Sequence, residues 1–180
     1  MASSRFHAAL APRARVLNII WAAFLAAPIF YTAVGWVVGR NPRPDAGGEV
    51  PTGLLQAVFL LAGAAAVAAS YLVPRRLLAD GRLRALLRGP LPGTPLPGTA
   101  DLEPAEQRLA LLFPHYQTTL IVTLALRESL AVLGLVLTIL TGNFLLMVPW
   151  SVAAIGLIAT TPPRPAGFLE RALPLARAAG

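Results

Sequence analysis

The sequence predicts an all-α integral membrane protein, a single membrane domain over residues 1–180 with four transmembrane helices paired as two hairpins. Three observations predict it: a low charge content, four long apolar runs, and the placement of the arginines between them. Charged residues make up 13% of the chain and hydrophobic residues 56%, whereas a soluble domain carries about 25% charged residues. The absence of cysteine excludes disulfides and thiolate metal sites.

Four apolar runs approach or exceed the roughly 20 residues with which a helix crosses a hydrocarbon core about 30 Å thick. They cover residues 16–39, 54–73, 118–141 and 144–161. The fourth run is short and contains Pro149. The first run is longer than the roughly 7–15-residue apolar core of a signal peptide, which predicts a retained membrane helix.

The arginines predict the orientation, because cytoplasmic segments of membrane proteins carry an excess of basic residues. Outside the four spans, the successive segments hold three, two, six, none and three arginines, and the chain has no lysine. Both termini, the middle loop 74–117 and the tail 162–180 are therefore expected in the cytoplasm. We expect the membrane to be a bacterial inner (cytoplasmic) membrane.

The connections differ in character. Gly142 is expected to take the left-handed conformation that ends a helix, and Asn143 to cap the next one. The Pro- and Gly-rich segment after residue 39 predicts an exposed loop, and the LPGT repeat within 89–99 predicts a linker. Helical character resumes after the linker, with a break expected near Pro114, and the tail is loosely amphipathic.

Residues 74–88 alternate leucines with a set of basic residues: Arg75, Arg76, Arg82, Arg84 and Arg88. This pattern is typical of an amphipathic helix that lies on an anionic membrane surface. A solvated extension of the second span would have the same composition, and the sequence leaves both interpretations open.

In the third span, steps of three and four residues bring small and polar side chains onto one stripe. The stripe consists of Thr119, Thr123, Arg127, Ala131, Gly134, Thr138 and Thr141. Stripes of this kind normally pack on other helices, because small residues allow close approach and hydroxyls bond across the contact. Arg127 is therefore expected to face protein or trapped water.

Glu128 is the one carboxylate in the four spans, and it follows Arg127 directly. Adjacent helix residues do not face each other, so the two charges need not pair. The candidate partners of Arg127 in the other spans are Asn18, Tyr31, Thr32, Gln56, Ser70 and Tyr71. Glu128 is expected near the bilayer midplane, about 15 Å from either end of its span. An ionisable group there indicates either proton binding or a polar contact between helices.

The run RESLAVLGLVLTIL resembles the carboxylate helix of the proteolipid c subunits of rotary ATPases. The matching positions are Glu128, Ala131, Gly134 and Leu135, and the resemblance implies that Glu128 would carry the proton. The adjacent Arg and the placement of the carboxylate in the third span depart from that family. The second hairpin is also similar to uncharacterised small bacterial four-helix membrane proteins.

These features predict a non-enzymatic membrane subunit of a larger assembly, in contact with lipid and with other membrane subunits, as a homo- or hetero-oligomer. The alternative is a proton-translocating subunit that uses Glu128. We expect no cofactor, no metal site and no nucleic-acid partner, because the two histidines lie far apart outside the spans and no phosphate-binding or nucleophile motif occurs.

Overall fold

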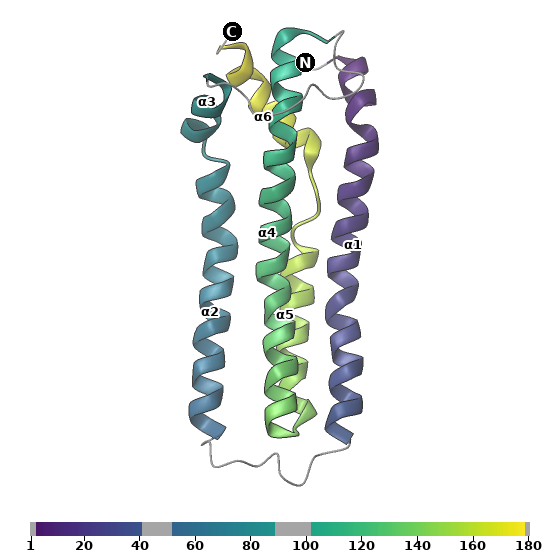
Figure 1. Cartoon of the computed structure of the whole chain (residues 1–180), viewed down its shortest axis with the longest axis vertical. Coiled ribbons are helices and arrows are strands. Elements are labelled where there is room, and N and C mark those ends of the chain that lie inside the picture. The colour runs from purple at the N-terminus through teal and green to yellow at the C-terminus, as the bar shows by residue number, and fades with distance from the viewer. Residues whose placement is uncertain (1–2, 41–51, 89–101, 179–180) are drawn as a thin grey trace. The chain divides into compact units, whose positions relative to one another are not determined.

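The computed structural model describes residues 3–40, 52–88 and 102–178, and every regular element in these ranges is helical. The long helices are α1 (Ser4–Arg40), α2 (Thr52–Leu77) and α4 (Pro104–Thr141) (Figure 1). The shorter elements are α3 (Asp80–Arg88), the 3₁₀ helix η1 (Phe144–Leu146), α5 (Met147–Ala159) and α6 (Pro165–Arg177). The all-α prediction is confirmed.

The chain forms two compact units. Unit 1 comprises Met1–Ile20, Leu72–Ile121 and Pro163–Gly180, and unit 2 comprises Trp21–Tyr71 and Val122–Pro162. Helices α1, α2 and α4 contribute residues to both units, α3 and α6 belong to unit 1, and α5 belongs to unit 2.

Three helical segments are long and apolar enough to cross a membrane: Ser4–Arg40, Gly53–Leu77 and Pro104–Thr141. The chain is therefore a membrane protein. The apolar stretch Phe144–Ala159 is shorter. With η1 and α5 end to end it measures about 26 Å, against a hydrocarbon core of about 30 Å.

Unit 2 carries an apolar surface. Its large exposed hydrophobic side chains include Leu61 at 73% and Leu145 at 74% exposure. Along the long helices, exposed apolar residues extend over 16–37 of α1, 54–72 of α2 and 122–140 of α4, and all but Val16, Ile19 and Leu72 belong to unit 2. At 1.5 Å per residue, these stretches measure about 32, 27 and 27 Å, close to the thickness of a hydrocarbon core. Such a surface is suited to lipid and not to water.

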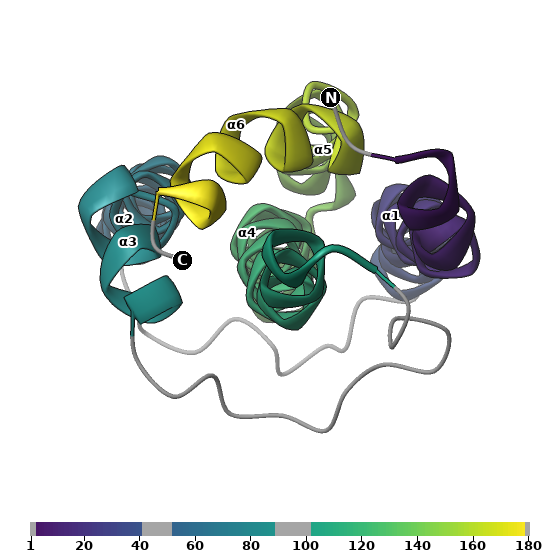
Figure 2. The same cartoon turned by 90° about the horizontal axis from the view of Figure 1, so that it is seen from above.

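The inside of unit 2 combines buried aliphatic side chains, such as Leu124 and Leu137, with glycines that make room for one large aromatic ring. Helix α4 lies between α1 and α2, with α5 alongside (Figures 1 and 2). The Trp150 side chain of α5 fills the space beside Gly63 of α2 and Gly134 of α4, and a Cβ added at Gly134 would lie 2.7 Å from the Trp150 Cβ. The absence of side chains at the two glycines thus allows close helix packing.

Unit 1 has a larger apolar core. The fully or nearly buried side chains come from α1, α3, α4 and α6 and include Phe6, Leu17, Leu83, Leu87, Leu109, Phe113, Leu169 and Leu173. Helix α6 lies beside α3 (Figure 2). The Tyr116 ring stacks on the Phe168 ring at a centroid distance of 4.8 Å. This core holds α6 against α3 and α4.

The helices are longer than the predicted spans. Helix α1 begins at Ser4, twelve residues before the predicted start at 16, and α2 continues through Pro74 to Leu77. The break expected near Pro114 is wrong, because α4 runs unbroken from Pro104 to Thr141. A proline costs a helix one hydrogen bond, but here its neighbours Ala110 and Phe113 are both fully buried, and their packing holds the helix together.

The predicted turn of the second hairpin is confirmed. Gly142 has a φ of 67°, and its N–H donates to the Thr138 carbonyl at 2.8 Å. The Asn143 side chain accepts from the Leu145 N–H at 3.0 Å, which caps η1. The predicted exposed loop after residue 40 and the LPGT linker lie outside the described residues.

We expect Gly63→Ala and Gly134→Ala to lower the free energy of unfolding by about 1–3 kcal/mol each, the usual cost of overpacking. An added Cβ would collide with the Trp150 ring at Gly63 and would lie 2.7 Å from the Trp150 Cβ at Gly134. Unfolding in mixed micelles measures the effect. Gly156→Ala is the matched control, since nothing lies within 4 Å of its added Cβ. Equal stability of all three variants would contradict the proposed close packing.

Candidate functional site

Arg127 is buried in unit 2, with 4% of its surface exposed. Its NH1 group donates to the Leu157 carbonyl and to the Thr161 hydroxyl, and its Nε donates to the Ser70 hydroxyl at 3.4 Å. The centre of the guanidinium lies 5.1 Å from the Tyr71 ring centroid. A cation over an aromatic face is attracted by the ring quadrupole. The charge is thus held by polar and aromatic groups and by no carboxylate of the described residues.

These contacts place Arg127 at the carboxyl end of α5. The last carbonyls of a helix have no partner within the helix and carry a partial negative charge. Here the Gly156 carbonyl accepts from the Thr160 N–H at 3.2 Å, and the Ile158 carbonyl accepts from the Trp21 indole N–H at 3.1 Å. The Leu157 carbonyl between them accepts from Arg127 and from the hydroxyls of Thr160 and Thr161. Side chains from α1 and α4 therefore complete the end of α5.

The site lies beside the apolar surface and not at its edge. Counted along α4, Arg127 is five residues, or about 8 Å, past Val122, where the exposed apolar stretch of that helix begins. In hydrocarbon, backbone groups must be hydrogen-bonded within the protein, because no water is present. The donors from Arg127 and Trp21 keep the Leu157 and Ile158 carbonyls hydrogen-bonded within the protein.

The chain that follows α5 has few donors to satisfy. Pro162 and Pro163 have no backbone N–H, and the Thr161 N–H donates to the Ile158 carbonyl at 3.0 Å. In unit 1, the Arg164 N–H donates to the Tyr116 hydroxyl at 3.0 Å. The irregular segment between α5 and α6 is thus hydrogen-bonded at each N–H that it has.

Glu128 is half-buried and accepts a hydrogen bond from the Tyr31 hydroxyl of α1 at 2.8 Å. It forms no ion pair with Arg127, and the two ion pairs among the described residues are Arg171–Asp80 and Arg177–Glu103, both in unit 1. Along α4, Glu128 is about 9 Å from the start of the exposed apolar stretch and about 18 Å from its end. It therefore lies nearer one end of this stretch than the expected midplane position.

The polar stripe of α4 is buried. Thr119, Thr123 and Thr138 are each exposed by 3% or less. The Thr119 hydroxyl donates to the His115 carbonyl at 2.8 Å and the Thr138 hydroxyl to the Gly134 carbonyl at 3.0 Å, each within α4. In unit 2, Gly134 packs against Trp150 of α5, so this part of the stripe contacts helices of the same chain.

The basic residues of segment 74–88 are all exposed: Arg75, Arg76, Arg82, Arg84 and Arg88. The leucines between them are not free to enter lipid, because Leu83 is 1% and Leu87 2% exposed, with α6 alongside. Asp80 of α3 also accepts from Arg171 of α6 at 2.6 Å. Helix α3 therefore uses its apolar face inside unit 1 and presents its arginines outward.

Sequence reasoning found part of this site. Ser70 and Tyr71 were among the expected partners of Arg127 and do contact it, whereas Tyr31 bonds Glu128 and Thr32 bonds Ser151. The carbonyls at the end of α5 were missed. Their signal was the run TTPP at 160–163, since a proline pair marks the point at which a helix has to stop.

Comparisons with protein-family models, curated proteins and solved structures find no match for this chain. The arrangement of Arg127, Trp21 and the end of α5 is therefore interpreted from its own chemistry.

We expect Arg127→Met to lower the free energy of unfolding by about 1–3 kcal/mol, because it removes the hydrogen bonds that join α4 to Leu157 and Thr161 and to Ser70 of α2. Chemical unfolding in mixed micelles, followed by helix content, measures the change. Arg76→Met is the matched control, because Arg76 is exposed. If both variants lose the same stability, the capping role of Arg127 is wrong.

Proposed function

We propose that this chain crosses a bacterial inner membrane four times and acts there as a non-enzymatic subunit of a larger membrane assembly. In this proposal α5 with η1 is the fourth span, and both termini and segment 74–117 are cytoplasmic. Two features support the topology. The arginine count is highest in the segments assigned to the cytoplasm. Leu145, Val148 and Val152 of the fourth span are exposed, as lipid-facing residues are.

One observation carries the proposed role: the polar side chains inside unit 2 are used to hold its own helices together. Arg127 joins α4 to α2 and α5, Tyr31 and Glu128 join α1 to α4, and Thr32 and Ser151 join α1 to α5. No buried side-chain nitrogen or oxygen in the described part of the chain lacks a hydrogen-bond partner. Such an interior favours a helical scaffold over a catalytic centre.

The surface for a neighbouring subunit would be the outer face of α2. Ala64, Ala65 and Ala68 are exposed there, next to the exposed Leu61 and Leu72. Small residues one turn apart let a second membrane helix approach closely. The exposed arginines of α3 would meet anionic headgroups or an acidic cytoplasmic partner.

A second candidate function is proton transfer through Glu128, in line with the resemblance to the proteolipid c subunits. The favouring observation is the Tyr31–Glu128 hydrogen bond, which places a half-buried carboxyl beside a second proton-bearing group within unit 2.

The native mass of the protein, gently extracted from its own membrane together with its co-purifying chains, tests the proposed role. The expected result is one or two copies bound to unrelated membrane subunits. A ring of many identical copies would favour the proton carrier instead, and a monomer without partners would overturn the proposal.

Glu128→Gln separates the two functions, because the amide oxygen still accepts from Tyr31 while the side chain no longer titrates. As a scaffold, the variant is expected to keep the native mass and the proton flux of the reconstituted assembly within about a factor of two, with a stability change below the roughly 1 kcal/mol of one hydrogen bond. Proton flux is measured with a pH-sensitive dye in vesicles. Tyr31→Phe is the control that removes the hydrogen bond but keeps the carboxyl. Abolished flux in the Gln variant alone would establish Glu128 as the proton carrier.

A further inference from the structure

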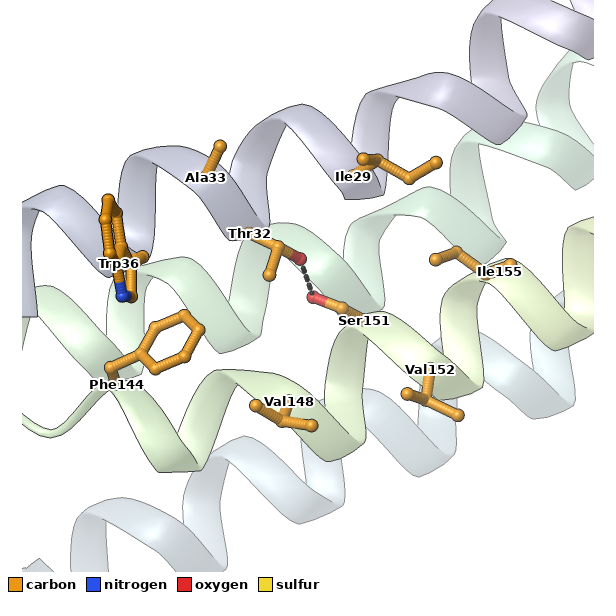
Figure 3. Close-up of a pocket in the computed structure, with 9 residues that line it drawn as sticks. All are labelled: Ile29, Thr32, Ala33, Trp36, Phe144, Val148, Ser151, Val152 and Ile155. Atoms are coloured by element: carbon orange, nitrogen blue, oxygen red, sulfur yellow. Dashed lines mark hydrogen bonds between the residues drawn. The ribbon is translucent and has the colours of Figure 1, made fainter.

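A groove runs between α1 and α5 on the surface of unit 2, with a volume of about 440 Å³ (Figure 3). Helix α1 lines it with Ile29, Thr32 and Trp36, and α5 lines it with Val148, Val152 and Ile155. Ile29 is 60% and Val152 64% exposed, so the groove opens to the outside. Its size is within the range of small-molecule sites, roughly 300–1,000 Å³.

The polar groups in the floor of the groove already have hydrogen-bond partners within the protein. Its two hydroxyls, those of Thr32 and Ser151, hydrogen-bond each other at 2.9 Å, and Thr32 also donates to the Pro28 carbonyl at 2.7 Å (Figure 3). The other lining side chains are apolar. The occupant of this part must therefore be a hydrocarbon.

One end of the groove carries a positive charge. The Arg40 guanidinium lies over the Trp36 ring, 3.7 Å from its centroid, at the last turn of α1. Arg40 is exposed, and no described residue forms an ion pair with it. Tryptophan and arginine at the end of a membrane helix are typical of the headgroup level. An anion would be attracted to this end.

The dimensions match one leaflet of a bilayer. Eleven residues separate Ile29 from Arg40, which is about 16 Å along α1, and half of a hydrocarbon core is about 15 Å. A lipid with its headgroup at Arg40 would extend its acyl chain along the groove to Ile29.

A second helix fits the groove less well than an acyl chain does. Helix contacts in membranes rely on small residues, yet the walls of this groove are bulky. The nearby glycines of α1 are already used inside unit 2, because a Cβ at Gly39 would lie 2.9 Å from the Phe144 Cβ and one at Gly35 would collide with Met147.

From these observations the structure assigns the groove to one acyl chain of an anionic phospholipid, whose phosphate is held by Arg40. This assignment depends on the membrane location of unit 2 and on neither of the two functions discussed above.

Native mass spectrometry of the protein released from nanodiscs of equal phosphatidylglycerol and phosphatidylcholine content tests the assignment. The wild-type chain is expected to retain one lipid, with phosphatidylglycerol favoured about fivefold, the effect of one basic residue near an anionic surface. Arg40→Gln is expected to abolish this preference, and Val152→Phe, which fills the groove from an exposed position, to abolish retention itself.

Two variants serve as matched controls. Leu61→Phe adds bulk at an exposed position of α2, and Arg76→Gln removes an exposed arginine from the last turn of that helix. Both variants should retain phosphatidylglycerol as the wild type does. Equal retention of the two lipids by the wild type, or equal losses in the controls, would overturn the assignment. If the wild type is a dimer that Val152→Phe dissociates, the groove binds a second copy of the chain and the assignment is wrong. If free phosphate displaces the lipid, the acyl chain is not needed for binding, which also overturns the assignment.

Discussion

The end of α5 is the point on which the rest of unit 2 depends. A helix that stops beside lipid leaves carbonyl groups that water cannot reach, and each unpaired group costs a few kcal/mol. Arg127 of α4 and Trp21 of α1 donate hydrogen bonds to two of these carbonyls. The same guanidinium reaches Ser70 and Tyr71 of α2. One side chain thus fixes three helices relative to one another. The free-energy cost of burying its charge is offset by its hydrogen bonds and by the Tyr71 ring.

The two units differ in the surfaces that they expose, and this follows from where the charges lie in the sequence. Unit 2 buries glycines, hydroxyls and aliphatic side chains and exposes many leucines and valines. Unit 1 has phenylalanine and leucine inside and exposed arginines on α3 and α6. Buried Glu106 has its hydrogen-bond partners within unit 1, since it accepts from the N–H and the hydroxyl of Ser3 at 2.7 and 2.9 Å. Most of the exposed large hydrophobic side chains therefore lie on unit 2, and the exposed arginines of α3 and α6 lie on unit 1.

The sequence predicted the features that depend on local pattern. The apolar runs, the Gly142–Asn143 turn and Ser70 as a partner of Arg127 all follow from composition, spacing and backbone chemistry. The helix ends were missed, because Pro74 and Pro114 are held inside helices by packing that no local pattern encodes. The capping of α5 was also missed. It pairs a side chain with backbone carbonyls 30 residues away, and carbonyls occur at every position of a sequence.

The capping of α5 by Arg127 has a consequence for biogenesis. An arginine inside an isolated membrane helix costs up to roughly 2.5–3.5 kcal/mol to insert, and in the proposed four-span topology α5 on its own would enter the bilayer with an open carboxyl end. Each segment supplies what the other lacks, and the tight Gly142 turn keeps them adjacent. The two should therefore leave the translocon together as a hairpin, and a longer turn, which delays their meeting, should send more of the newly made chain to quality-control proteases.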